Sequence, residues 1–153
     1  MTVKSGGMNV DHITWVQNEP TGILATVDQE GKVYLTPVHF VIWEGDFFFH
    51  SKMSGQKMSN IRANRQVSFC VYRMRGIVPH PDGQPCRTNT NYDSVTLQGA
   101  AEIVNDPQLR DRILRKILEK YTPHLAGTEI AQQHAQRTAV VRIRPEQMTW
   151  KSK

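Results

Sequence analysis

The stretch GILATVDQEGKVYLTPVHFVI, residues 22–42, decides the fold. Ile23 to Val27 is a short apolar run, and Asp28 to Lys32 has the glycine and side-chain acceptors of a tight turn. Val33 to Ile42 then continues as a long, mostly apolar strand. Two apolar runs joined by so short a turn predict an antiparallel β-hairpin.

Pro37 interrupts the second strand of this hairpin. Because proline has no N–H to donate to a strand ladder, it is confined to edge strands and bulges. We therefore predict that this strand lies at a sheet edge, or bends at Pro37 and leaves neighbouring backbone groups free for another use.

The rest of the chain alternates short strands with helices. Periodicity predicts helices over 11–18, 56–64, 107–121 and 129–136, and further strands over 47–51, 67–71, 95–104 and 139–144. Residues 73–91 carry three prolines, two glycines and no periodicity, and we predict a loop there, either a functional flap or a disordered excursion. The order of elements predicts a mainly β protein, a closed or nearly closed antiparallel barrel with peripheral helices.

Composition restricts the class of protein. The chain has 153 residues, 39% of them hydrophobic and 22% charged, which fits one globular domain over 1–153 with residues 1–10 flexible. Cys70 and Cys86 are too few for a disulfide framework or a zinc cluster. No apolar run reaches the roughly 18 residues of a membrane span. We expect a cytoplasmic protein with no membrane association and no metal site.

The net charge of +5, from 19 Lys and Arg against 14 Asp and Glu, points to an anionic partner. Much of this charge falls on the helix predicted over 107–121, whose basic residues we interpret as its solvated side: Arg110, Arg112, Arg115, Lys116 and Lys120.

A candidate anion site lies in the stretch HSKMSGQK, residues 50–57, where a strand passes through glycine into a helix. The first turn of a helix has unpaired N–H groups and the positive end of the dipole, so it suits a phosphate. Lys57 adds a charge, and Ser51 and Ser54 add hydroxyl donors. The alternative is a capped helix with a solvated basic face.

Several short segments, in order, carry a resemblance to a known family: Gly22–Val27, Pro37–Val41, Phe49–Ser51 with Gly55–Lys57, Asn64–Phe69, and Tyr92–Val95 with Gly99–Ala101. Together they resemble the pyridoxamine 5'-phosphate oxidase-like FMN-binding split-barrel proteins, in particular the branch similar to nitroimidazole-resistance reductases. The resemblance covers approximately residues 22–121. It implies a six-stranded antiparallel split barrel that forms a homodimer, with FMN in two grooves at the subunit interface.

The resemblance also implies roles for individual residues. The cofactor-binding set is Thr36, Pro37, Val38 and His39 along the isoalloxazine, His50, Ser51, Gln56 and Lys57 at the ribityl phosphate, Ser94 facing the cofactor, and Trp150. Gln56 stands where pyridoxamine phosphate oxidases tend to have arginine, and Arg62 or Arg65 is a hypothetical substitute. Trp150 either stacks on the partner subunit's flavin or covers the end of the barrel.

The implied activity is a flavin-dependent oxidoreductase that passes electrons from NAD(P)H to a small electrophile such as a nitroaromatic or a quinone. His39 is the candidate proton donor to the substrate. The substrate-binding arginine and histidine motif that true pyridoxamine phosphate oxidases carry near their C-terminus is not recognisable in this sequence, so we do not expect vitamin B6 oxidation.

Three alternatives stay open. A haem could use His39 or His50 as its axial ligand, and a deazaflavin could replace FMN. Single-stranded nucleic acid could stack on aromatic residues, namely Trp43, Phe47, Phe48 and Tyr72. This alternative ranks below the flavin because the basic residues are not gathered on one strand face.

Overall fold

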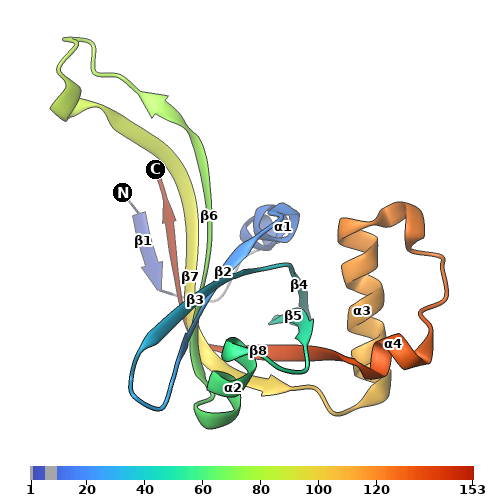
Figure 1. The fold of residues 1–153 in the computed structure, drawn as a ribbon. Coiled ribbons are helices and arrows are strands. Elements are labelled where there is room, and N and C mark those ends of the chain that lie inside the picture. The colour runs from blue at the N-terminus through green and yellow to red at the C-terminus, as the bar shows by residue number, and fades with distance from the viewer. Residues whose placement is uncertain (1, 6–9) are drawn as a thin grey trace.

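The computed structural model describes residues 2–5 and 10–153 and consists mainly of one antiparallel sheet that curls into a split barrel (Figure 1). The strands are β1 (Thr2–Ser5), β2 (Gly22–Val27), β3 (Val33–Val38), β4 (Phe40–Trp43), β5 (Asp46–Lys52), β6 (Gln66–Val78), β7 (Asn89–Ile103) and β8 (Thr138–Ser152). Their order is β3-β2-β6-β7-β8-β5-β4, with β1 paired to β8. The predicted fold class is confirmed, although the sheet has eight strands where six were expected.

The helices lie around this sheet. They are α1 (Val10–Asn18), α2 (Gln56–Ala63), α3 (Pro107–Tyr121) and α4 (Gln132–Gln136), with short 3₁₀ turns over Pro85–Arg87 and Pro123–Leu125. The Asp106 side chain caps α3 by accepting from the Gln108 N–H at 2.9 Å, as its place before Pro107 predicts. The helix predicted over 129–136 is shorter than expected, because α4 begins only at Gln132.

The strand predicted over 33–42 is in fact two strands that belong to different parts of the sheet. β3 pairs with β2, with Val38 opposite Gly22, whereas β4 pairs with β5, with Phe40 opposite Phe49. The chain therefore changes partner at His39, which forms a corner of the barrel. Since β3 is the last strand in the sheet order, the prediction that Pro37 lies in an edge strand is confirmed.

The two ends of the loop predicted over 73–91, residues 73–78 and 89–91, are also strand. β6 continues to Val78 and β7 begins opposite it at Asn89, so that a long hairpin arm projects away from the barrel (Figure 1). The register of this hairpin shifts between Met74 and Gly76, and Gly76 has a φ of 149°. A bulge of this kind breaks the two-residue period, which is why the pattern gave no strand signal there.

The last strand does not stop before Pro145 as predicted, because β8 runs on to Ser152. Pro145 lies opposite Gly99 at a register shift in the β7–β8 ladder, where a missing N–H is tolerated. Gly99 is required at this place: a Cβ on it would lie 2.1 Å from the carbonyl oxygen of Arg144.

The N-terminal residues differ in part from the expectation of flexibility over 1–10. Residues 2–5 form β1, which pairs with Thr149 to Ser152 of β8. Residues 1 and 6–9 lie outside the described residues.

The apolar core has two parts, one on each side of the sheet. The barrel interior holds Leu24, Phe40, Phe47, Phe49 and Phe69, among others. The second part lies between the outer side of the β4–β5 hairpin and α3, where Val41 and Phe48 pack against Ile113, Leu114 and Ile117. In the described part of the chain, no helix is long and apolar enough to cross a membrane.

The close approach at Gly99 allows a test of the barrel. We expect Gly99→Ala to lower the free energy of unfolding by about 1–3 kcal/mol, because the added methyl group meets backbone atoms that cannot move aside. Gly127→Ala is the matched control, since nothing lies within 4 Å of a Cβ there, and its effect should stay below about 0.5 kcal/mol. Equal urea midpoints for the two variants would contradict this account of the β7–β8 ladder.

Candidate functional site

Strand pairing sets the face of the sheet on which each predicted site residue lies. Residues opposite each other in antiparallel strands share a face, and successive residues alternate. Thr36 is opposite the buried Leu24, so Thr36 and Val38 point into the barrel. Ser51 points the same way, since it follows the core residue Phe49 by two positions.

Pro37 and Ser94 lie on the outer face. The pairs Pro37–Ile23, Ile23–Cys70 and Cys70–Thr96 lie opposite each other across β3, β2, β6 and β7, so these residues share one face. Ser94 is two residues from Thr96 on β7 and lies on the same face. His50 is also on the outer side, two residues after Phe48, which packs under α3. The predicted residues are thus divided between the two faces of one sheet.

The corner at His39 carries the densest group of functional side chains. The exposed His39 ring stacks on Tyr121 of α3, with centroids 4.3 Å apart and an interplanar angle of 18°. His50 lies on strand β5, and its ring centroid is 6.2 Å from that of His39. The two histidines that the sequence singled out are therefore brought together, with a tyrosine that the sequence did not suggest for the site.

Tyr121 also holds the backbone of the corner. Its hydroxyl accepts a hydrogen bond from the Phe40 N–H at 2.8 Å and lies 3.0 Å from the carbonyl oxygens of Phe40 and Pro20, to either of which it can donate. Burial raises the pKa of Tyr121, although its bond to the Phe40 backbone opposes this, so the phenol keeps its proton at neutral pH. The sequence analysis gave Tyr121 no role beyond its place at the end of the helix predicted over 107–121.

Lys120, next to it, contacts the same backbone. Its Nζ donates to the Phe40 carbonyl at 2.9 Å and lies 3.8 Å from the centroid of the Phe40 ring. Burial lowers the pKa of Lys120 to about 8, and the charge of Glu19 only partly opposes the shift.

Other basic residues of α3 also contact the protein, so the interpretation of these side chains as a solvated face is wrong for several of them. Lys116 lies over the Trp43 ring, 3.8 Å from its centroid. Arg115 donates to the carbonyl oxygens of Ala126 and Thr128, at 2.7 and 3.1 Å. These contacts fix α3 and the segment after it, and the charges are not gathered for an external anion.

Two buried polar atoms at the end of β5 have no hydrogen-bond partner, Nδ1 of His50 and Oγ of Ser51. Leaving such an atom unpaired costs about 1–3 kcal/mol, so each of the two atoms calls for an explanation. Since adjacent strand residues face opposite sides of the sheet, Ser51 and His50 mark two different places. The pKa of His50 is lowered, chiefly by burial and then by the charges of His39 and Lys57. The His50 imidazole is therefore neutral at neutral pH and has one nitrogen to donate and one to accept.

The start of α2 follows this pair directly. Its N-cap, Gly55, has a φ of 113°, and no side chain caps the helix. Lys57 is half-buried on the first turn, near enough to His50 to affect the pKa of the imidazole. The helix start and Lys57 thus provide an electropositive end beside the unpaired atoms of β5.

Gln56 and the two suggested substitute arginines are already engaged. The Gln56 side chain donates to Asn60 at 2.8 Å. Arg62 donates to the Met53 carbonyl at 2.6 Å, which braces the loop before α2. Arg65 donates to the Ala101 carbonyl at 3.2 Å and pairs with Glu102 at 2.9 Å.

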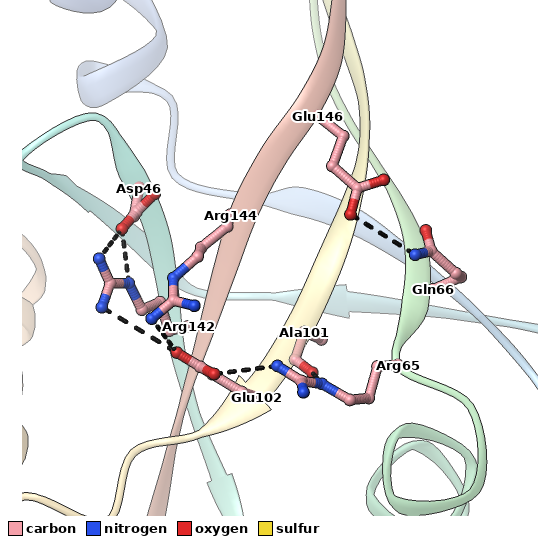
Figure 2. A network of polar contacts seen from close by, with 8 residues as sticks. All are labelled: Asp46, Arg65, Gln66, Ala101, Glu102, Arg142, Arg144 and Glu146. Atoms are coloured by element: carbon pink, nitrogen blue, oxygen red, sulfur yellow. Dashed lines mark hydrogen bonds and ion pairs between the residues drawn. The ribbon is translucent and has the colours of Figure 1, made fainter.

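Glu102 belongs to a wider network, drawn in Figure 2, that the sequence analysis missed. It pairs with Arg144 at 2.6 Å and with Arg65, and it lies 4.0 Å from Arg142, which is itself bound by Asp46. The network ties β5, β7 and β8 together at the barrel wall. It also pairs three arginines with carboxylates of the protein itself, so these side chains are engaged within the fold.

Ser94 and Trp150 lie far from the corner within one chain. Ser94 is opposite Lys151 of β8, while His50 is opposite Val140, eleven residues earlier on the same strand. Eleven strand residues have a length along the chain of about 36 Å, and the direct separation is shorter because β8 bends (Figure 1). Trp150 is only 5% exposed and packs edge-on against Trp15, with centroids 5.6 Å apart, so its indole covers the end of the core.

The outer face around Pro37 and Ser94 is apolar and open. Its large exposed side chains come from three neighbouring strands: Ile23 of β2, Val33 and Leu35 of β3, and Tyr72 and Met74 of β6. Leu35 is 64% exposed and Tyr72 is 53% exposed. A contiguous apolar sheet face of this kind marks an interaction surface.

The family model described as pyridoxamine 5'-phosphate oxidase matches residues 13–152. The chain belongs to that family. A search of curated proteins found no match.

Solved structures of the same fold carry different names. A 5-nitroimidazole antibiotic resistance protein from Bacteroides thetaiotaomicron is 19% identical, with a TM-score of 0.77 over 98% of this chain and 88% of that one. An FAD and heme binding protein from Mycobacterium smegmatis is 14% identical, with a TM-score of 0.84 over 98% and 73%. An F420 reductase is 23% identical, with a TM-score of 0.58 over 88% and 93%. At these identities the likeness shows the fold alone.

Lys120 gives the site a measurable pH signature. Its pKa is about 8 in the folded chain against an ordinary 10.5, so between these values the unfolded chain holds a proton that the folded chain has lost. Raising the pH from 8 to 10.5 should therefore stabilise the wild type relative to Lys120→Met in urea unfolding. If the difference in free energy of unfolding between the two proteins stays constant over this pH range, the burial of Lys120 at the corner is contradicted.

Proposed function

We propose that the protein is an FMN-dependent oxidoreductase that reduces a small electrophile, such as a nitroaromatic or a quinone, with electrons from NAD(P)H. The observation that supports this most directly is the unpaired Ser51 hydroxyl beside the uncapped start of α2 and the Lys57 ammonium. A phosphate would accept hydrogen bonds from all three and would remove the cost of the buried, unpaired hydroxyl.

Bound FMN would supply the electron and hydride transfer. The chain would supply a phosphate anchor at Ser51 and Lys57, and a proton at the corner. His39 is the candidate proton donor to the substrate, because its ring is exposed and its plane is held by Tyr121. The inward-facing Thr36 and Val38 would act mainly through the strand backbone that they keep in place.

Two observations favour a dimer with the cofactor between the subunits. The outer face of β2, β3 and β6 exposes apolar side chains that a second copy would cover. Within one chain Ser94 pairs with Lys151 near the end of β8, whereas His50 pairs with Val140 near its start, so we infer that a site using both regions is completed by a partner.

A second candidate cofactor is haem, favoured by the neutral, unpartnered imidazole of His50 only 6.2 Å from His39. A deazaflavin phosphate would use the same helix start as FMN. Absorption spectra of the purified protein distinguish them, since a flavin band that survives dialysis supports FMN and a Soret band supports haem. No spectral change at saturating FMN would contradict the proposed cofactor.

The phosphate anchor is tested by Lys57→Ala. We expect this change to weaken FMN binding roughly 10- to 150-fold in an equilibrium titration, because it removes a charge-assisted contact. Arg87→Ala is the control, since Arg87 is exposed on the hairpin arm and pairs with Asp82. Equal affinities of the two variants would remove Lys57 from the site.

The subunit interface is tested by Leu35→Asp. Leu35 is largely exposed in a single chain, so the change should leave the fold intact and weaken self-association by burying a charge in the contact. Light scattering after size exclusion should then find a smaller mass than for the wild type. Gln108→Asp, at the exposed start of α3, should keep the wild-type mass. A Leu35→Asp protein of unchanged oligomeric mass would place the interface elsewhere.

A further inference from the structure

A second cavity lies beside His50, on the outer side of the sheet under α3 and α4. Its volume is about 420 Å³, and its apolar walls come from Leu114, Ile117, Leu118, Leu125, Ile130 and Ala135. This size falls within the range of pockets that hold small organic ligands. It is formed by α3, the segment after it, α4, and the His50 and Thr138 positions of β5 and β8.

The polar groups of the cavity restrict what it can hold. No lysine or arginine lines it, and Glu129 does, so an anion such as a flavin phosphate has no counter-charge there. His50 and His134 also lie in its wall, and the neutral His50 imidazole can either donate or accept. A cavity with mostly apolar walls and a few hydrogen-bonding side chains fits a neutral ligand with a single hydrogen-bonding group.

We propose that this cavity binds a neutral, mostly apolar ring compound that makes one hydrogen bond to the imidazole of His50. The site is separate from the phosphate anchor and does not require bound flavin. His50 stands between the two, because it lines the cavity and is also near enough to Lys57 of the anchor for that charge to affect its pKa.

The test uses isothermal titration of the full chain, with and without FMN, with 2-naphthol as the probe. We expect saturable binding of one 2-naphthol per chain in both states. The charged analogue 2-naphthoate should bind at least tenfold more weakly, because its carboxylate meets Glu129 and no cation. Equal binding of the two compounds, or no saturable binding of 2-naphthol, would overturn the proposal.

Variants locate the binding within the cavity. Ala131→Trp fills the cavity from its rim and should weaken 2-naphthol binding at least tenfold, whereas Gln136→Trp, on the same helix but outside the lining, should not. Thr128→Trp is a second filling variant, on an exposed segment where the fold tolerates change. Wild-type affinity in both filling variants would overturn the proposal.

Two further readouts separate this site from the flavin site. His50→Phe should reduce the preference for 2-naphthol over naphthalene about five- to tenfold, the effect of one lost hydrogen bond. Ala131→Trp should bind FMN like the wild type. If Ala131→Trp loses FMN and 2-naphthol together, the cavity is part of the flavin site and the proposal of a separate site is wrong, while the proposed function stands.

Discussion

The hydrogen bonds that Tyr121 and Lys120 make to the backbone of Phe40 are the constraint on which the rest of the structure depends. The chain changes strand partners at His39, and the polar groups of Phe40 are bonded there by the end of α3. This contact fixes α3 over β4 and β5, and it holds His39 against Tyr121 with its ring exposed. Both the corner and the cavity under α3 follow from it.

Five arginines are paired with carboxylates of the protein itself. Arg65, Arg142 and Arg144 share the carboxylates of Glu102 and Asp46, and Arg73 and Arg75 share Asp93, where Ser152 also donates. Burial alone would raise the pKa of Asp93, but Ser152 and the two arginines hold it below its ordinary value. Lys57, at the start of α2, has no carboxylate partner in the described part of the chain and lies beside the candidate anion site.

Local patterns predicted the parts of the fold that local forces decide. The hairpins, the cap at Asp106 and the edge position of Pro37 are properties of a few neighbouring residues. The arm over 73–91 was missed because the bulge at Gly76 breaks the strand period, and β8 was cut short because Pro145 is tolerated only opposite Gly99. The family resemblance pointed to His39, His50 and Lys57. The hydrogen bonds of Lys120 and Tyr121 to Phe40 join residues about 80 positions apart, and no local sequence pattern predicts such contacts.

The central claim is that one chain holds only part of the flavin site and that a second copy completes it. Sedimentation equilibrium over a range of protein concentrations, followed at both the protein and the flavin absorption bands, tests this most directly. If the site is shared, FMN strengthens self-association, and flavin sediments only with the dimer, because a ligand that binds one state stabilises it. Flavin that sediments equally well with the monomer, with no change in the dimer dissociation constant, would contradict the account.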